Sequence, residues 1–566
     1  MSCDNTPTAS GCGTLRIDDV NRLFDDLRES VLRDHPADPV AYLKERLLTK
    51  AATISSTPKL CTAITERYPS VLDERALSIV VLGASGDLAK KKTFPALFQL
   101  YCNGLLPPKV NIVGYARSEI PNVDEWKQTL AKYFAHVDEL ECHIPVFLER
   151  ISYIAGSYSE VADFEKLSVH LRRFEESHRA PCGGGNRLFY LALPPTVFVQ
   201  ACRGIRLGAL PVNEGVDGWA RIIVEKPFGR DSDSSNQLSN ALGELFSEKH
   251  LYRIDHYLGK EMVQSILTTR FANRVFSAVW NCNNIANVQI TFKEKIGTEG
   301  RGGYFDSFGI IRDVVQNHLT QILALVAMEK PHTLDSEHIR NEKVALLRCV
   351  EAARVEDCVL GQYTSSKDGS IPGYLDDPTV PKGSRCPTFA MVRLNIRNDR
   401  WSGVPFLLKA GKALEDKAVV IRIQFKDELV PFGDMAQRNE LVIRAQPSEA
   451  MYLKLTAKVP GMTNSTHQTE LDLTYADRYS VKLPDAYESL IFDAIQGNAT
   501  NFVRKDELEA AWKIFTPLLH AIDRGEVHPV PYMAGTRGPK EADEMIVKSG
   551  FKKVEGYHWT TKLSLL

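Results

Sequence analysis

A glycine-rich turn is the first segment of the sequence whose residue types could do chemistry. The turn spans 83–89, follows the apolar run 77–82 and precedes a helical pattern from about 90 to 103. Small residues at such a turn let the backbone approach a pyrophosphate at the helix N-terminus. The turn departs from the strict G-x-G-x-x-G pattern, and a tight turn without a ligand would use similar residues. Because strand, turn and helix follow in the required order, we expect a dinucleotide site formed by Gly83, Ala84, Ser85, Gly86, Asp87 and Leu88.

Arg117 indicates which dinucleotide this site would take. The strand expected at 110–115 is followed by Ala116, Arg117 and Ser118. NAD-binding proteins place a carboxylate near this point to bind the ribose, whereas a guanidinium suits the 2′-phosphate of NADP. Arg117 therefore favours NADP over NAD, with a solvated surface arginine as the alternative.

Two kinds of strand must position these residues. The runs 77–82, 110–115, 188–193 and 220–224 are almost wholly apolar and alternate with helices, which is typical of a parallel sheet covered on both faces. Beyond residue 256 the strands alternate polar with apolar residues, as in 286–292, 392–396 and 420–425, and helices are expected at 310–328 and 508–522. We therefore expect an α/β Rossmann-like dinucleotide-binding domain, followed by a larger α+β domain with a mainly antiparallel sheet.

Composition limits the other functions. The chain has 566 residues and a net charge of −2, so it lacks the basic excess of a nucleic-acid-binding protein. The longest apolar run, 322–328, is far shorter than the roughly 20 residues that cross a bilayer, so no membrane segment is expected. The 11 cysteines include no CxxC pair and no histidine at zinc-site spacing, which predicts a reducing compartment and no metal.

The expected domains are 1–75, 76–255 and 256–566. The first is an N-terminal extension, partly flexible, with a helix near 20–32 and prolines at 36 and 39. It holds Cys3 and Cys12, which could be exposed redox thiols or unremarkable reduced ones. The second would bind NADP, and the third would bind substrate and form oligomer contacts.

Several longer motifs carry a resemblance to a known family. They are the turn 83–92, Glu225-Lys226-Pro227-Phe228-Gly229, the nonapeptide Arg253-Ile254-Asp255-His256-Tyr257-Leu258-Gly259-Lys260-Glu261, the stretch 297–306, and Asp313-Val314-Val315-Gln316-Asn317-His318. From about residue 76 onward the chain resembles the glucose-6-phosphate dehydrogenases. The resemblance implies oxidation of glucose 6-phosphate at C1 by NADP⁺ to 6-phosphogluconolactone, the first step of the oxidative pentose phosphate pathway. It also implies a cytoplasmic homodimer or homotetramer.

The resemblance assigns the catalytic pair. Oxidation at C1 needs a base for the hydroxyl proton, and histidine has a suitable pKa. The family's base corresponds to His318, and the carboxylate that orients its imidazole corresponds to Asp255. A histidine beside Leu319 and Ile322 could instead be a packed core residue.

The resemblance also assigns the substrate contacts. His256, Tyr257 and Lys260 match the phosphate site, and His256 and Lys260 would share a face if a helical turn forms there. Lys226 matches a residue that contacts both substrate and cofactor. Asp313 and His318, five residues apart, lie about 140° around an ideal α-helix and need not share one face. The remaining substrate contacts are Glu294, Asp313, Lys412, Lys417, which replaces the arginine common in animal enzymes, and Gln446.

Two questions stay open at this level. The resemblance maps the second, structural NADP site of animal members onto Lys293, Arg422, Arg444, Lys454 and Trp559, but Ala418 stands where those members have lysine. The chain could also oxidise another aldose phosphate, or be a catalytically silent NADP-binding scaffold or redox sensor that uses Cys3 and Cys12.

Overall fold

The computed structural model describes residues 75–134, 140–178, 184–211, 215, 218–427, 436–475, 478 and 483–552. The chain divides into two units, Met1–Val71 and Leu72–Leu566, and all that follows concerns the second. The predictions made for the N-terminal extension, for Cys3 and Cys12 and for Trp559 lie outside the described residues.

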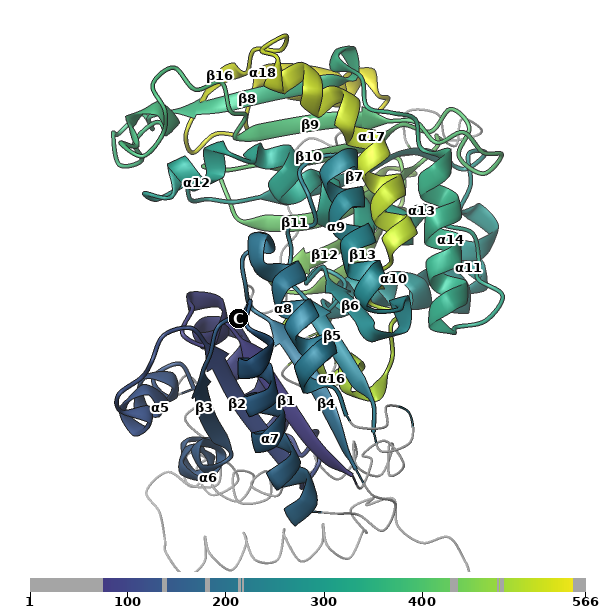
Figure 1. Cartoon of the computed structure of the whole chain (residues 1–566). Helices are drawn as coiled ribbons and strands as arrows, with labels where there is room; N and C mark the ends of the chain where they lie inside the picture. Colours follow the sequence, from purple (N-terminus) through teal and green to yellow (C-terminus); the bar gives the residue numbers. More distant parts are fainter. Residues whose placement is uncertain are drawn as a thin grey trace, which may run out of the picture. The chain divides into compact units, whose positions relative to one another are not determined.

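The first sheet has seven strands in the order β15-β6-β5-β4-β1-β2-β3 (Figure 1). All its pairs are parallel except β15 with β6. The apolar runs at 77–82, 110–115, 188–193 and 220–224 form four of these strands, which confirms the predicted parallel sheet. The strands are β1 (Ala76–Leu82), β2 (Val110–Ala116), β3 (Ile151–Ala155), β4 (Gly185–Leu191), β5 (Ala220–Val224), β6 (Leu251–Ile254) and β15 (Phe502–Val503).

Both faces of this sheet are covered because successive side chains of a strand point to opposite sides. Ile79 and Val81 of β1 pack with one apolar cluster, whereas Val80 and Leu82 pack with the other. The first cluster takes in α4 (Phe94–Cys102), α5 (Val123–Ala131), α6 (Ile144–Glu149) and α16 (Ala486–Gln496). The second takes in α7 (Val161–Ser177), α8 (Phe198–Gly204) and α9 (Ser232–Leu245).

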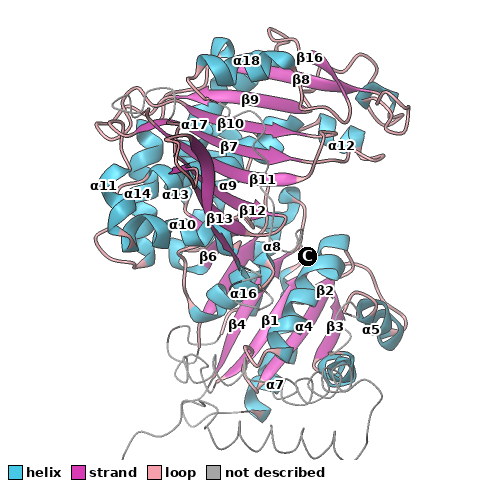
Figure 2. Ribbon diagram, turned by 180° about the vertical axis from the view of Figure 1, so that it is seen from behind, coloured by secondary structure: helices cyan, strands magenta, loops and turns pink. Residues whose placement is uncertain are grey.

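The second sheet has nine strands in the order β14-β13-β12-β11-β7-β10-β9-β8-β16 (Figure 2). Its pairs are antiparallel except β10 with β7 and β16 with β8, so the predicted mainly antiparallel sheet is confirmed. The strands are β7 (Ile285–Lys293), β8 (Cys358–Thr364), β9 (Phe389–Leu394), β10 (Phe406–Gly411), β11 (Ala418–Phe425), β12 (Glu440–Gln446), β13 (Ala450–Lys458), β14 (Thr466–Thr474) and β16 (Val530–Met533).

Helices pack on the central strands of this sheet. The π-helical segment η6 (Ile311–Leu319) runs on into α13 (Thr320–Ala327), and both belong to the same apolar cluster as β7, β10 and α17 (Lys505–Asp523). The others are α10 (Glu261–Ala272), α11 (Arg274–Val279), α12 (Gly302–Asp306), α14 (Ser336–Cys349) and α18 (Lys540–Lys548). None of the helices in the described ranges combines the length and apolarity needed to cross a bilayer.

More than one chain segment connects the two sheets, because a segment late in the sequence returns from the second sheet to the first. After β14, α16 packs on one face of that sheet and β15 pairs with β6. Arg221 on β5 donates through Nη1 to the carbonyl oxygens of Ala494 (2.8 Å) and Ile495 (2.6 Å), which fixes the end of α16.

Candidate functional site

The glycine-rich turn between β1 and α4 has the geometry expected of a dinucleotide site. Gly83 has φ of 85°, and a Cβ built on it would lie 2.2 Å from the carbonyl oxygen of Ala192, so only glycine fits. The Gly86 N–H donates to the Gly83 carbonyl (2.8 Å), and the chain then enters the π-helical segment η1 (Ala89–Thr93) that leads into α4. The close backbone and the helix start fit the diphosphate of a dinucleotide.

Arg117 lies at the same edge of the sheet, because β2 pairs directly with β1 and Arg117 follows β2. Its guanidinium carbon sits 5.7 Å from the ring centre of Tyr158, and the side chain is exposed. A cation held on a tyrosine beside the dinucleotide turn suits the 2′-phosphate that distinguishes NADP from NAD.

Asp255 and His318 form a buried hydrogen-bonded pair. Asp255 directly follows β6, His318 lies on η6, and His318 Nδ1 is 2.5 Å from Asp255 Oδ1. The backbone N–H of Tyr257 also donates to Asp255 Oδ1 (3.0 Å). Asp255 and His318 are only 3% and 2% exposed, so the pair is sheltered from water. A carboxylate on Nδ1 leaves Nε2 as the atom that can accept a proton.

The charges of the pair suit a general base. Burial by itself raises the pKa of Asp255, but the charge and hydrogen bond of His318 outweigh it and bring the pKa to about 2. Burial and the Lys226 ammonium lower the pKa of His318, while Asp255 opposes them, and the result lies below the usual value of 6.5. At neutral pH the structure therefore holds an ionised carboxylate and a neutral imidazole.

Lys226 connects this pair to the main pocket. Its Nζ lies 3.1 Å from His318 Nε2, donates to the backbone carbonyl of Asp313 (2.9 Å), and sits 3.5 Å from the Asp313 carboxylate. Asp313 and His318 therefore lie on the same side of their helix, unlike the 140° separation expected for an α-helix. The reason is that 311–319 is π-helical, and in an i→i+5 helix residues five apart are one turn apart.

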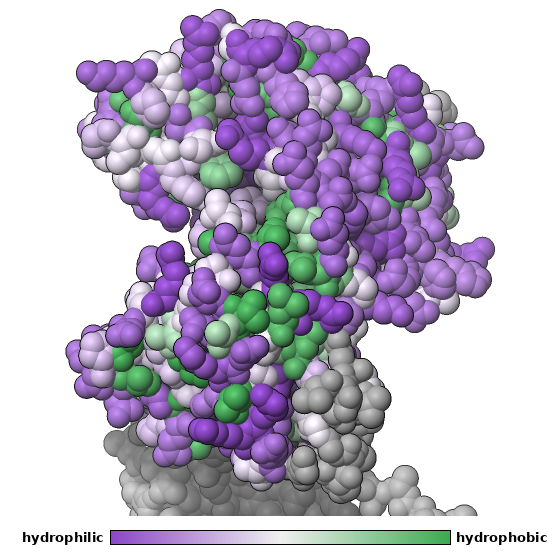
Figure 3. All heavy atoms as spheres, viewed as in Figure 1, coloured by the Kyte–Doolittle hydropathy of each residue, from purple (hydrophilic) through white to green (hydrophobic). Residues whose placement is uncertain are grey.

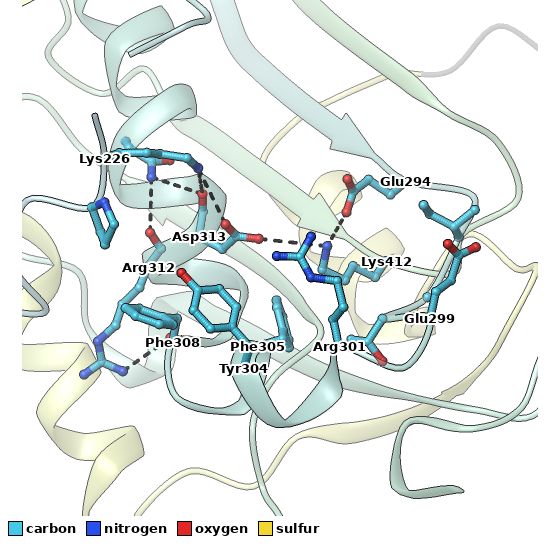
Figure 4. Close-up of a pocket in the computed structure, with 15 residues that line it drawn as sticks. Lys226, Glu294, Glu299, Arg301, Tyr304, Phe305, Phe308, Arg312, Asp313 and Lys412 are labelled. Atoms are coloured by element: carbon cyan, nitrogen blue, oxygen red, sulfur yellow. Dashed lines mark hydrogen bonds and ion pairs between the residues drawn. The ribbon is translucent and has the colours of Figure 1, made fainter. Parts of the chain in front are cut away.

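A pocket of about 380 Å³ opens at this point, and Lys226, Glu294, Asp313 and Lys412 line it (Figure 4). Lys412 Nζ is 2.5 Å from Glu294 and 3.9 Å from Asp313, so carboxylates and ammonium groups alternate along the wall. Such alternating acceptors and donors suit a polyhydroxylated ligand. Figure 3 shows a hollow at the left edge of the molecular surface.

The residues predicted to bind phosphate gather beside the pair. The ring centres of His256 and Tyr257 lie 4.5 and 4.4 Å from that of His318, and Lys260 Nζ lies 5.2 Å from the Tyr257 ring. Gln446 donates to the Tyr257 hydroxyl (3.3 Å). The expected helical turn is a run of i→i+3 turns over 255–260, and α10 begins only at Glu261.

Sequence reasoning missed one cation of this cluster. Burial lowers the pKa of Lys260, the carboxylates of Asp485 and Glu449 oppose this, and the positive charges of Lys92 and the exposed Lys417 lower the pKa further, so three ammonium groups act on the same region. Lys92 also lies 3.6 Å from Asp485 and 5.9 Å from the ring centre of Tyr487. The sequence did contain a signal for this cation, the run of three lysines at 90–92. Successive residues of a helix point in different directions, so one of the three could be expected to face the site.

A second polar cavity lies on the other sheet. Its volume is about 280 Å³, and Lys293, Ala418, Arg422, Arg444 and Lys454 all line it, as the second-site prediction grouped them. Three of these cations already have carboxylate partners: Lys293 is 2.5 Å from Glu415, and Arg422 and Lys454 are 2.5 and 3.3 Å from Glu440.

Comparison with known proteins gives matches along most of the chain. The family model described as "Glucose-6-phosphate dehydrogenase, NAD binding domain" matches residues 80–265, and "Glucose-6-phosphate dehydrogenase, C-terminal domain" matches 267–560. A Solanum tuberosum protein named "Glucose-6-phosphate 1-dehydrogenase, cytoplasmic isoform" is 54% identical over 490 residues, which cover 85% of this chain and 93% of that protein. A Dictyostelium discoideum glucose-6-phosphate 1-dehydrogenase is 52% identical over 497 residues, 87% of this chain and 98% of that protein.

A solved structure is similar over the same span. It is described as "Glucose-6-phosphate dehydrogenase in complex with its substrate glucose-6-phosphate" and is 46% identical to this chain, with a TM-score of 0.81. The match covers 85% of this chain and 99% of that structure.

Proposed function

The chain belongs to the glucose-6-phosphate dehydrogenase family, and from this premise we propose how its residues carry out the reaction. The protein oxidises β-D-glucose 6-phosphate at C1 with NADP⁺, giving 6-phospho-D-glucono-1,5-lactone and NADPH. The observation that carries the residue assignment is the chain of contacts from Asp255 through His318 to Lys226 at the edge of the main pocket.

His318 is the general base. Its neutral Nε2 takes the proton of the C1 hydroxyl, and the Asp255 carboxylate on Nδ1 stabilises the imidazolium that forms. Lys226 holds its ammonium 3.1 Å from Nε2, so the substrate hydroxyl displaces that contact when it binds. Burial of the pair keeps bulk solvent from competing for the proton.

The sugar is held by contacts remote from C1. His256, Tyr257 and Lys260 bind the 6-phosphate dianion, and the exposed Lys417 adds charge. Binding energy gained there positions C1 against the base. Lys226 contacts both substrate and cofactor, and the sugar hydroxyls are bound by Glu294, Asp313, Lys412 and Gln446.

NADP⁺, when bound, accepts the hydride at C4 of its nicotinamide. The residues that hold it are Gly83, Ala84, Ser85, Gly86, Asp87 and Leu88 at the turn, Arg117 for the 2′-phosphate, and Lys226. The turn fits this group because its small residues 83–86 form a tight loop, closed by the Gly86 N–H on the Gly83 carbonyl, directly before a helical segment.

The organisation of the molecule completes the proposal. The domains are 1–75, 76–255 and 256–566, and the functional unit is a homodimer or homotetramer built through the larger sheet. The protein works in the cytoplasm, which agrees with the names of the potato and Arabidopsis thaliana relatives. A second NADP is not part of the proposal, because Ala418 supplies no cation to the second cavity and three of the cations around it are paired.

Absorbance at 340 nm tests the proposal against its two rivals. Purified protein is given glucose 6-phosphate, galactose 6-phosphate or free glucose, each with NADP⁺ or NAD⁺. Rapid NADPH formation with glucose 6-phosphate alone supports it. Equal rates with galactose 6-phosphate would favour a dehydrogenase for other aldose phosphates, and no turnover by folded, NADP⁺-binding protein would favour a scaffold or redox sensor.

A further inference from the structure

A small cavity adjoins the main pocket and reaches the catalytic pair. Asp255, Gln316 and Gln321 contribute to its wall, and Lys226 and Arg312 line both this cavity and the main pocket. The space open to the centre of a water molecule is about 20 Å³. A single water needs on the order of 10–15 Å³, so the cavity has room for at least one.

Two buried acceptor atoms in its wall have no donor. Asp255 Oδ2 and Gln321 Oε1 are both shielded from solvent, and neither accepts a hydrogen bond within the part of the chain that the structure describes. Each of the two residues is only 3% exposed. Native proteins rarely leave such atoms unsatisfied, because a buried acceptor that has given up its water without gaining a donor destabilises the fold. The pair of acceptors therefore calls for a donor inside the cavity.

The protein's charged and indole donors around the cavity are already engaged. Lys226 Nζ donates to the backbone of Asp313, and Arg312 is bidentate to the Asp523 carboxylate. The indole N–H of Trp512 donates to the backbone of Phe228 (3.0 Å). A carboxylate oxygen and an amide oxygen cannot satisfy each other. A water can, since it donates two protons and still accepts from an amide such as that of Gln316.

We propose that Gln321 is a positioning residue for the catalytic pair: together with Gln316 it holds a buried water that donates a hydrogen bond to Asp255 Oδ2. The water fixes the free oxygen of the carboxylate, so that Oδ1 stays directed at His318 Nδ1. The inference rests on the roles proposed above for His318 and Asp255.

The water also sets the basicity of His318. A donor on Oδ2 draws negative charge away from Oδ1, so removing it leaves a more concentrated charge facing the imidazole. Imidazolium is then favoured, and the pKa of His318 rises. None of the variants below changes another charged or titratable group that faces the pair, so a shift in the pKa of His318 can be attributed to the water. These groups are Lys226, Asp313, His256, Tyr257, Tyr487, Glu225 and Arg312.

Gln321→Met keeps the length of the side chain and removes its polar atoms. We expect kcat/KM to fall about tenfold and its acidic limb to move to higher pH by about 0.5–1 unit, which is part of the effect of one lost hydrogen bond to a charged group. The KM for glucose 6-phosphate should stay within about twofold, because the cavity is not part of the phosphate site. A merely structural role would lower the melting temperature without moving the acidic limb.

Two further variants make the result interpretable. Thr320→Val is the matched control, since Thr320 is the neighbour on the same helix, is 1% exposed, and donates to the Val315 carbonyl (2.8 Å), away from the cavity wall. Its acidic limb should stay in place. Ala511→Val adds two methyl groups to the cavity wall and should reproduce the Gln321→Met shift by expelling the water.

A high-resolution crystal structure of the full chain decides the same question directly. The expected result is a water oxygen within hydrogen-bond distance of both Asp255 Oδ2 and the Gln321 amide. An empty cavity, a direct Gln321–Asp255 bond, or an unshifted acidic limb in Gln321→Met would each overturn the inference. Failure of the proposed function would look different, as an active His318→Asn variant.

Discussion

Replacing Asp255 by asparagine tests how much the carboxylate contributes to catalysis. Asparagine keeps the shape and one acceptor oxygen but removes the charge that faces His318. Interactions in the folded protein bring the pKa of Asp255 from its usual 3.8 to about 2, even though burial opposes this. At 1.36 kcal/mol per pH unit, a difference of this size is about 2 kcal/mol, which corresponds to a rate factor on the order of 10 to 100.

This factor is a lower limit for the variant. The pKa shift is a net value, because burial of the carboxylate cancels part of its attraction to the imidazolium. The full attraction between Asp255 and the imidazolium, which forms as the proton is transferred, is therefore larger than the shift implies. Asparagine can in addition stabilise the wrong imidazole tautomer, a loss of about 10⁴ in kcat where the same replacement was made in a serine protease triad. We therefore expect kcat for Asp255→Asn to fall by about 10² to 10⁴, with the KM for glucose 6-phosphate within about threefold.

The assay is the initial rate of NADPH formation at saturating NADP⁺, over a range of glucose 6-phosphate concentrations. Asp493→Asn is the matched control, because Asp493 on α16 is half-buried, accepts hydrogen bonds from Asn498 and Asn501 in the segment after that helix, and has a pKa raised by burial to about 6. Its kcat should be that of the wild type. An Asp255→Asn enzyme within fivefold of wild-type kcat would refute the reasoning.

The same pair makes a prediction about acid stability. The folded-state pKa of Asp255 lies below the unfolded value, so the carboxylate stabilises the fold fully above about pH 4. That contribution is lost as the pH falls from about 4 to about 2. Urea titrations between pH 7 and 3 should show a smaller pH dependence for Asp255→Asn than for the wild type. An identical slope would contradict the folded-state charge assigned to Asp255.

Three other predictions concern the cofactor, the substrate and the fold. Arg117→Leu should raise the KM for NADP⁺ about 10- to 100-fold and leave that for NAD⁺ nearly unchanged, because only NADP⁺ carries the 2′-phosphate; equal changes would rule out this role. Lys260→Met should raise the KM for glucose 6-phosphate at least tenfold with a smaller change in kcat, and slow oxidation of free glucose should be unaffected. Lys343 and Glu507 form a fully buried ion pair (2.7 Å), so Lys343→Met should lower the free energy of unfolding by about 3–5 kcal/mol, and adding Glu507→Leu should restore much of it in urea titrations.

The parallel sheet could be predicted because its strands are buried on both faces. A run such as 77–82 is apolar except for Ser78, and the structure extends it by only one residue, to Ala76. The glycine turn and Arg117 follow from the same reasoning, since both sit at carboxyl ends of adjacent parallel strands. Local chemistry and a short sequence separation were enough for these features.

Features that depend on distant contacts could not be predicted. The sequence 311–319 has no proline or glycine that would mark a π-helix, so the shared face of Asp313 and His318 was not foreseen. The return of α16 and β15 to the first sheet rests on contacts between residues more than 200 apart, such as Arg221 with Ala494. The position of Lys92 beside the phosphate residues depends on η1 meeting the start of α16, where Asp485 and Tyr487 lie.

The most direct test of the central claim is the turnover of His318→Asn beside its substrate binding. We expect no NADPH formation above background at 340 nm, while calorimetric titration gives a dissociation constant for glucose 6-phosphate within about threefold of wild type, because the phosphate contacts are intact. A His318→Asn enzyme that turns over at the wild-type rate would contradict the assignment of the base and the account built on it.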